Sequence, residues 1–336
     1  MRILLVDDSI LVRGMMKALL ESLGYDVVGE EANGRAAVSA AAGLRPDLII
    51  MDVNMPEMDG ITATGIIMKE TPVPIIVFTS EDVADVGYRA VNEGAVEVIP
   101  KPDISEMNDI AFRSRIREIL EAVASAGAGR RSHQELFSEL RRTEVPCARR
   151  YDTEIIVVGA STGGPSAVRT LISALPADFP VPLILTQHIQ QGFDAGYADW
   201  LDDSAKLCVR LAKPQDKPAA GVVIVAPATH HLVCSRGALC WDDGPRLDNQ
   251  KPSVDKMFIS AADAYGPGVT GVLLTGMGRD GANGCRQIID RGGDTIVQDA
   301  QTSIIFGMPK AAIELGAASE VLALEHIAGE LIRRQG

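Results

Sequence analysis

The sequence predicts an α/β protein with two doubly wound domains, and three observations support this fold class. Short aliphatic runs alternate with segments of helical periodicity. The runs are apolar at consecutive positions, as expected of parallel strands that are buried on both faces of a sheet. The alternation stops near residue 122 and begins again near residue 151 of the 336-residue chain. A chain of this length is also longer than a single core usually supports.

The first predicted domain, residues 1–122, contains five candidate strands. Helical patterns at residues 11–24 and 34–44 separate the first three strands. Five parallel strands in a segment of this length are typical of the smaller, flavodoxin-like version of the doubly wound fold. The expected strands cover residues 2–6, 26–30, 47–53, 74–80 and 96–100.

Residues 123–150 differ in composition from both flanking segments. The stretch begins with small residues interrupted by glycine and continues with polar residues and pairs of arginines. We interpret it as an interdomain linker with room for one short helix. A solvated connector is favoured over a basic binding patch.

The second predicted domain, residues 151–336, is a further α/β pattern with six candidate strands. A glycine-rich turn, GASTGGP at residues 159–165, follows the first of them and carries Ser161 near its tip. The expected strands cover residues 154–160, 182–188, 206–212, 221–227, 270–276 and 295–299.

Composition argues against several classes of function. A net charge of −13 disfavours a chain whose main role is to bind nucleic acid or anionic lipid. The five cysteines form no C-x-x-C pair and no zinc-site spacing, which is typical of reduced thiols in the cytosol. Four apolar residues precede Asp7, too few for a signal peptide, and no apolar run approaches the length of a membrane span. We therefore expect a cytoplasmic protein without membrane insertion and without a nucleic-acid partner.

Polar side chains follow the expected strands of the first domain. Asp7 and Asp8 follow the first strand, Asp52 ends the third, Thr79 ends the fourth, and Lys101 follows the fifth. The carboxyl ends of parallel strands meet at one edge of a sheet, so these side chains should converge. Three carboxylates suit a hard cation such as Mg²⁺, and a lysine with a hydroxyl suits the oxygens of a phosphoryl group. Each residue alone would be an ordinary solvated loop residue, but their joint placement favours a site.

These residues lie in motifs that resemble the response-regulator receiver family. VDDS, DLIIMDVNMPEMDG, FTS and PKP occur in the family's order and spacing over residues 1–122. The resemblance implies that a histidine kinase phosphorylates Asp52. It also implies a Mg²⁺ site formed by Asp8, Asp52 and the backbone carbonyl of Asn54, with Asp7 in support.

The receiver resemblance assigns two further roles and shows one departure. Thr79 would be the switch hydroxyl, and Lys101 would contact the phosphoryl group ahead of a cis Pro102. Many receivers have Tyr or Phe where Val98 stands in this chain. The departure puts the family's aromatic switch in doubt here, and leaves the expectation of phosphorylation unchanged.

The turn around Ser161 admits two interpretations. A glycine-rich turn after a strand can bind phosphate at a helix N-terminus. However, GASTGGP fits neither the P-loop pattern nor the dinucleotide-binding pattern. Alternatively Ser161 is a nucleophile, which requires a base. His188 ends a predicted strand and is the preferred base, with His230 and His231 as rivals.

A nucleophilic serine also requires an acid that orients the base. Asp280 is preferred, because it lies in a glycine-dense loop after an apolar strand. Asp255 precedes an apparent helix and is interpreted as a cap or an exterior charge. Asp294 and Asp299 flank the next strand and are weaker candidates.

Residues 151 to about 334 resemble the catalytic domain of the CheB family of protein-glutamate methylesterases. GASTGGP, TQH, GF, IVAP, PSVD, LTGMGRDG and FGMPKAA occur in the family's order. The resemblance favours Ser161 as the nucleophile, with His188 as base and Asp280 as orienting acid. The backbone N–H groups near Thr162 and Met277 are candidates for the oxyanion hole.

The same resemblance implies the activity. The substrates would be γ-glutamyl methyl esters of chemoreceptors, with release of methanol, and receptor glutamines would be deamidated. No cofactor is expected in the catalytic domain. One departure from the family pattern is Gln250, near which relatives often have a histidine.

An alternative function is that of a regulator whose second domain only binds a ligand or protein. A DNA-binding output is disfavoured, because neither a helix-turn-helix pattern nor a basic domain follows residue 150.

Overall fold

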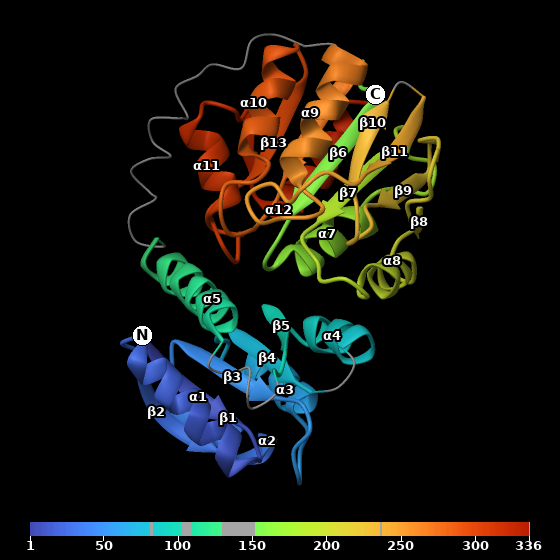
Figure 1. Ribbon diagram of the computed structural model, residues 1–336. Helices are drawn as coiled ribbons and strands as arrows, with labels where there is room; N and C mark the ends of the chain where they lie inside the picture. The colour runs from blue at the N-terminus through green and yellow to red at the C-terminus, as the bar shows by residue number, and fades with distance from the viewer. Residues whose placement is uncertain (81–82, 103–108, 130–151, 236, 336) are drawn as a thin grey trace. The chain divides into compact units, whose positions relative to one another are not determined.

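The computed structural model describes residues 1–80, 83–102, 109–129, 152–235 and 237–335 (Figure 1). The chain divides into two compact units, Met1–Gly127 (unit 1) and Ala128–Gly336 (unit 2). The linker predicted at residues 123–150 begins inside helix α5 (Ile110–Gly129), and its remainder lies outside the described residues. Within the described residues, no helix is both long and apolar enough to cross a membrane.

Unit 1 is a flavodoxin-like domain, as predicted. Its strands are β1 (Arg2–Val6), β2 (Asp26–Glu31), β3 (Leu48–Asp52), β4 (Ile75–Thr79) and β5 (Glu97–Pro100). They form a parallel sheet in the order β2-β1-β3-β4-β5, the order of flavodoxin-like folds. Its other helices are α1 (Ile10–Ser22), α2 (Gly34–Leu44), α3 (Gly60–Glu70) and α4 (Val83–Asn92).

Polar side chains fix where the first three helices of unit 1 begin. Ser9 accepts a hydrogen bond from the backbone at the start of α1, Asn33 does so for α2, and Asp59 for α3. These N-caps satisfy backbone N–H groups that have no partner inside the helix. The peptide bond before Pro102 is not cis, contrary to the resemblance; the cis bond found in the described residues joins Lys251 and Pro252.

Unit 2 contains a longer parallel sheet than the sequence predicted. Strand β6 (Ile155–Ala160) is central, with β7 (Leu183–Gln187) on one side and β12 (Val269–Leu273) on the other. The remaining strands are β8 (Cys208–Leu211), β9 (Val222–Val225), β13 (Asp294–Gln298) and β14 (Glu320–Leu322). The order is β14-β13-β12-β6-β7-β9-β8. The six predicted strands are present, and the short edge strand β14 was missed.

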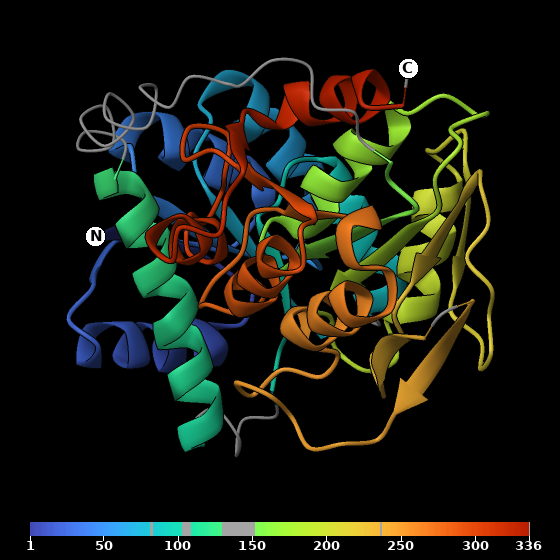
Figure 2. The same cartoon turned by 90° about the horizontal axis from the view of Figure 1, so that it is seen from above.

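A two-stranded antiparallel hairpin, β10 (His231–Ser235) and β11 (Ala238–Asp242), was also missed. The runs HLVCS and ALCWD pair with each other and are two residues apart in the sequence, and Gly237 between them has φ +89°. This spacing is a hairpin signal that the sequence offered. The hairpin lies beside helix α9 (Val254–Tyr265) and not in the large sheet (Figures 1 and 2).

Helices cover both faces of the large sheet (Figures 1 and 2). Helix α9 packs against α10 (Ala282–Asp290), and α10 packs against α11 (Met308–Glu314), on one face. Helix α7 (Gly164–Ser173) packs with α12 (Leu324–Arg333) on the other, and α8 (Asp194–Asp202) lies against β8.

The strand order reverses at β6. On one side of β6 the chain forms β7, then the edge strand β8, and then β9 between them; it later returns to the other side of β6 to form β12. The carboxyl ends of β12, β6 and β7 are therefore neighbours at a topological switch point. Ligands of open α/β sheets bind at such a point.

Gly60 allows α3 to start directly over the end of β3. A Cβ atom at this position would lie 1.8 Å from the backbone carbonyl oxygen of Asp52. We expect Gly60→Ala to destabilise unit 1 by roughly 1–3 kcal/mol, because the backbone must move to relieve the clash. Both tryptophans, Trp200 and Trp241, belong to unit 2. A urea transition seen by circular dichroism but not by tryptophan fluorescence therefore reports on unit 1.

Gly14, on the exposed side of α1, is the matched control. A Cβ atom there meets nothing within 4 Å. Gly14→Ala should stabilise unit 1 by up to about 1 kcal/mol, because alanine favours the helix. Equal effects of the two substitutions would contradict the close approach of α3 to β3.

Candidate active site and carboxylate cluster

Three neighbouring strands bring Ser161, His188 and Asp280 to one edge of the sheet in unit 2. Ser161 follows β6, His188 follows β7, and Asp280 lies in the loop between β12 and α10. The backbone ladder continues beyond the strands: the His188 N–H donates to the Ala160 carbonyl at 3.0 Å, and the Ser161 N–H donates to the Thr275 carbonyl at 3.0 Å. Ser161 and His188 are thus held in register by hydrogen bonds that continue those of the sheet.

His188 and Asp280 form a direct pair. His188 Nε2 lies 2.7 Å from Asp280 Oδ2, and only 2% of Asp280 is exposed. Burial alone would raise the pKa of the Asp280 carboxyl. The hydrogen bond and charge of His188, with the backbone N–H groups of Asp255 and Val254, outweigh burial and hold this pKa below its usual range. Asp280 is therefore an anion that accepts from the imidazole.

The second ring nitrogen of His188 is left available. Asp280 can only accept, so Nε2 carries the hydrogen and Nδ1 carries the lone pair in the neutral ring. Nδ1 is buried and has no hydrogen-bond partner in the described part of the chain. A buried lone pair on a residue that follows β7, the strand paired with β6, meets the chemical requirement for a general base.

The turn after β6 is shaped by glycines that allow close approach. Gly163 has φ +74°, and the Gly164 N–H donates to the Ser161 carbonyl at 2.7 Å. A Cβ atom on Gly276 would lie 2.8 Å from the Cβ atom of Ser161. The Gln187 side-chain amide donates to the carbonyl groups of Ser161 at 2.8 Å and His188 at 3.1 Å. The sequence analysis did not single out Gln187, which links the two segments.

Thr162 and Met277 lie in the loops next to Ser161. Thr162 follows it directly, and Met277 follows Gly276, which touches Ser161. Neither backbone N–H has a partner among the described residues. The Thr162 carbonyl accepts from the Thr275 hydroxyl at 3.0 Å. Two unpaired N–H donors beside a serine are the elements of an oxyanion hole.

The rival histidines occupy other environments. His231 is fully buried: Nδ1 accepts from the Ser253 N–H at 3.1 Å, and Nε2 lies 2.9 Å from the Pro245 carbonyl oxygen. Burial lowers the pKa of His231, and neither nitrogen is available to a substrate. His230 contacts the Thr229 hydroxyl at 2.7 Å and is the more exposed of the two.

The rival carboxylates cap other segments or face away from the site. The interpretation of Asp255 as a cap or an exterior charge is wrong: Ser253 is the N-cap of α9, and Asp255 is buried in the first turn of that helix, where it accepts from the Gly284 N–H of α10 at 2.6 Å. Burial raises the pKa of Asp255. Asp299 accepts from the Thr302 N–H at 2.9 Å, and Asp294 begins β13 at the opposite end of the strand.

In unit 1, the predicted carboxylates do converge. Oxygen atoms of Asp7, Asp8 and Asp52 lie within 4.8 Å of one another. Lys101 Nζ lies 2.6 Å from Asp7 Oδ2 and 2.7 Å from Asp52 Oδ2. Burial, with repulsion from Asp7, raises the pKa of Asp52 despite the contacts that Lys101 and the Val53 N–H make. Lys101 offsets only one of the three carboxylate charges, and an oxygen-only set of ligands with negative charge remaining fits a hard divalent cation.

The other predicted residues lie around this cluster. Thr79 is fully buried at the end of β4, and its carbonyl accepts from the Lys101 N–H at 2.7 Å. Asn54 is exposed, two residues beyond the end of β3. Val98 lies in β5 opposite Val77 and is partly buried.

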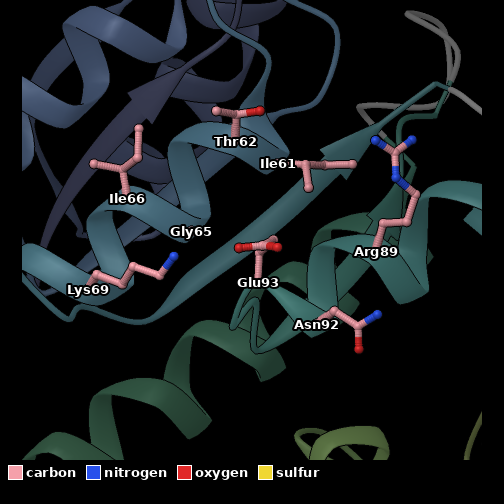
Figure 3. Close-up of a pocket in the computed structure, with 8 residues that line it drawn as sticks. All are labelled: Ile61, Thr62, Gly65, Ile66, Lys69, Arg89, Asn92 and Glu93. Atoms are coloured by element: carbon pink, nitrogen blue, oxygen red, sulfur yellow. The ribbon is translucent and has the colours of Figure 1, made fainter. Parts of the chain in front are cut away.

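A shallow hollow lies between α3 and the end of α4 (Figure 3). Glu93 lies between Lys69 and Arg89 in this view, so the lining mixes both signs of charge. Its other lining residues are Ile61, Thr62, Gly65, Ile66 and Asn92. The lining offers one carboxylate, so it does not repeat the metal-ligating pattern of the aspartate cluster.

Similarity to known proteins extends over nearly the whole chain. A family model described as CheB methylesterase matches residues 156–331, and one described as response regulator receiver domain matches residues 3–112. Protein-glutamate methylesterase/protein-glutamine glutaminase 2 of Anaeromyxobacter dehalogenans is 42% identical over 331 residues, covering 97% of this chain and 94% of the relative. A protein-glutamate methylesterase/protein-glutamine glutaminase of Archaeoglobus fulgidus is 38% identical, covering 99% of this chain and 97% of the relative.

One solved structure matches unit 2 in particular. The catalytic domain of Thermotoga maritima CheB methylesterase is 36% identical, with a TM-score of 0.52. The match covers 54% of this chain and 98% of that domain. These similarities confirm the resemblance predicted from the motifs.

Charge in the aspartate cluster predicts how unit 1 responds to Mg²⁺. We expect Asp52→Asn to raise the melting temperature of unit 1 in metal-free buffer, because its environment disfavours the Asp52 carboxylate. Mg²⁺ should stabilise the unsubstituted protein, by about 2.7 kcal/mol at roughly 100 times its Kd, and the variant much less. Scanning calorimetry with EDTA or Mg²⁺ measures both effects. Equal stabilisation of the two proteins would contradict a Mg²⁺ site at Asp52.

Proposed function

Because the chain belongs to the CheB methylesterase family, we propose that it is a phosphorylation-controlled serine hydrolase of bacterial-type chemotaxis. It removes methyl groups from γ-glutamyl methyl esters of chemoreceptors as methanol, and it deamidates receptor glutamines. The observation that supports this most directly is the His188–Asp280 pair: the other imidazole nitrogen, Nδ1, has no hydrogen-bond partner among the described residues, and His188 follows the strand that pairs with β6, after which Ser161 stands.

The proposed reaction uses Ser161, His188 and Asp280 in fixed roles. Ser161 Oγ forms a bond to the ester carbonyl carbon while His188 Nδ1 takes its proton. Asp280 holds the Nε2 hydrogen and stabilises the imidazolium. The N–H groups of Thr162 and Met277 bind the oxyanion, where one donor is typically worth roughly 3–4 kcal/mol.

The tetrahedral intermediate then collapses and releases methanol. The bond between the carbonyl carbon and the methoxy oxygen breaks, and His188 returns its proton to the departing methanol. Water then attacks the glutamyl ester on Ser161 while His188 takes one of its protons; the bond between the carbonyl carbon and Ser161 Oγ breaks, and His188 returns that proton to Oγ, which leaves the glutamate product and the free serine. With a glutamine substrate the leaving group is ammonia, and the remaining steps are the same.

In the receiver unit, Asp52 accepts a phosphoryl group from a histidine kinase. Asp8, Asp52 and the carbonyl of Asn54 would hold Mg²⁺, with Asp7 in support. Bound Mg²⁺ supplies positive charge to the carboxylates and to the phosphoryl oxygens. The Lys101 ammonium, already 2.7 Å from Asp52, contacts the phosphoryl group, and the Thr79 hydroxyl completes its binding.

Control requires coupling between the two units. We propose that the linker, residues 123–150, lets the unphosphorylated receiver cover the catalytic crevice, and that phosphorylation releases it. A shift of the open form from 1:99 to even odds needs only about 2.7 kcal/mol of differential stabilisation. The histidine kinase and the chemoreceptor helices are the partners, which implies a cytoplasmic location.

The proposed active site predicts which substitutions abolish methanol release and which leave it unchanged. Ser161→Ala, His188→Ala and Asp280→Asn should each lower methanol release from methylated receptor membranes by roughly 10⁴-fold or more, with the fold intact. His326, exposed in α12, supplies the matched control His326→Ala, which should retain full turnover. A Ser161→Ala protein with undiminished activity would indicate a domain that only binds its target. A larger loss in His230→Ala or His231→Ala than in His188→Ala would contradict the base assignment.

Occlusion predicts the behaviour of the separated catalytic unit. A fragment of residues 151–336 should show higher basal esterase activity than the unphosphorylated full chain and no response to a phosphodonor. Full-length Asp52→Asn, the matched control, should keep the low basal activity and lose the response. A folded fragment no more active than the full chain would show that the receiver activates by positive contact.

A further inference from the structure

The Asp280 carboxylate receives four hydrogen bonds, and only one comes from His188. Oδ2 accepts from His188 Nε2 at 2.7 Å and from the Val254 N–H at 2.8 Å. Oδ1 accepts from the Ser253 hydroxyl at 2.9 Å and from the Asp255 N–H at 2.8 Å. Three of the four donors therefore belong to the first turn of α9, about 25 residues before Asp280 in sequence.

Ser253 is the side chain that anchors this arrangement. It is fully buried and is the N-cap of α9, where its hydroxyl also accepts from the Lys256 N–H at 3.3 Å. A hydroxyl that accepts from the helix can still donate its own hydrogen, and that hydrogen is directed at Asp280. Ser253 thus links the start of the helix to the carboxylate that holds His188.

His231 fixes Ser253 from the other side. The Ser253 N–H donates to His231 Nδ1 at 3.1 Å, so this nitrogen carries a lone pair. Nε2 lies 2.9 Å from the Pro245 carbonyl oxygen, which can only accept, so Nε2 carries the hydrogen. The two contacts define one neutral tautomer of a fully buried ring. His231 begins β10, so this ring joins the hairpin to the N-terminus of α9.

We propose that Ser253 and His231 are positioning residues for the ester hydrolysis: His231 fixes Ser253, and Ser253 fixes the Asp280 carboxylate that orients the His188 ring. The inference rests on the proposed function for its reaction and on the four contacts to Asp280 for its geometry. Neither residue touches the reacting atoms, so each acts through the next member of the chain. Loss of the Ser253 hydroxyl leaves Oδ1 with one donor and lets the carboxylate rotate away from His188.

Kinetics of three serine variants test the role of Ser253. Ser253→Ala should lower kcat for methanol release about tenfold, equivalent to about 1.4 kcal/mol, with KM unchanged. Ser253→Thr keeps the hydroxyl and should restore most of the loss. Ser260 is the matched control: it also lies in α9 and accepts from the Cys234 N–H of the hairpin at 2.9 Å, but it does not contact Asp280. Ser260→Ala should leave kcat unchanged, and an equal loss there would overturn the proposal.

A double-variant cycle tests whether His231 acts through Ser253. His231→Ala should lower kcat by about the same factor as Ser253→Ala, and the double variant should be no slower than the slower single variant. His231→Asn offers a side-chain oxygen in place of Nδ1 and should retain more activity than His231→Ala. Fully multiplicative losses in the double variant would show two independent structural effects and overturn the relay.

A spectroscopic measurement tests the positioning without any substrate. The chain has five histidines, so selective ¹⁵N labelling of histidine gives few signals. The His188 Nε2 hydrogen should exchange faster with solvent in Ser253→Ala than in Ser260→Ala or the unsubstituted protein. An unchanged His188 signal in Ser253→Ala would overturn the positioning role even if the esterase is active. A protein without esterase activity that shows the expected change would contradict the proposed reaction and support the positioning.

Discussion

Two reciprocal contacts hold the helices α9 and α10 of unit 2 together: a carboxylate beside the start of each helix accepts hydrogen bonds from the N-terminus of the other. Asp280, which lies just before α10, accepts from the first backbone N–H groups of α9. Asp255, in the first turn of α9, accepts from the Gly284 N–H in the first turn of α10. Each anion lies at the positive end of the other helix, where backbone donors and the helix dipole favour negative charge. These reciprocal contacts join α9 to α10. Through Asp280 they also hold His188, and through Ser253 they connect to His231 at the start of the hairpin.

The pKa of one aspartate is shifted in opposite directions in the two units: it is lowered for Asp280 and raised for Asp52. The donors around Asp280 outweigh its burial, so its pKa is low and it stays ionised at the end of a fixed hydrogen bond. Burial raises the pKa of Asp52 despite its contact with Lys101, so a bound cation or a covalent partner would stabilise this side chain further. A permanent anion suits a residue that only orients a ring. A carboxylate that the fold disfavours suits a residue that is to be chemically modified.

Sequence reasoning located the residues at strand ends and missed those that act from helix starts and hairpins. Asp52, Ser161 and His188 follow long apolar runs, and parallel strands carry such residues to one edge whatever the loops do. Ser253 has no comparable local signal, and the position of His231 after a predicted strand indicated only a rival for the base. Ser253 resembles any N-cap, and the importance of His231 arises from Ser253, which lies 22 residues away. Such roles depend on where α9 and the hairpin pack, which local patterns do not determine. For the same reason the interpretation of Asp255 as a cap of its own helix or an exterior charge was wrong: its partner, Gly284, belongs to a different helix.

All the contacts that hold the proposed catalytic residues come from unit 2, which limits how phosphorylation of unit 1 can control the reaction. Ser161, His188 and Asp280 are held by β6, β7 and β12, by the Gln187 amide and by the start of α9, and all of these belong to unit 2. Glycines at close approaches, such as Gly276 beside Ser161, leave little space in which this assembly could relax. A site that is built entirely within one unit does not need the receiver for its construction. The proposed occlusion asks the receiver to change only whether a substrate reaches Ser161, and shifting such an equilibrium to even odds needs about 2.7 kcal/mol. This is the physical argument for proposing that phosphorylation controls access to the active site and not its chemistry.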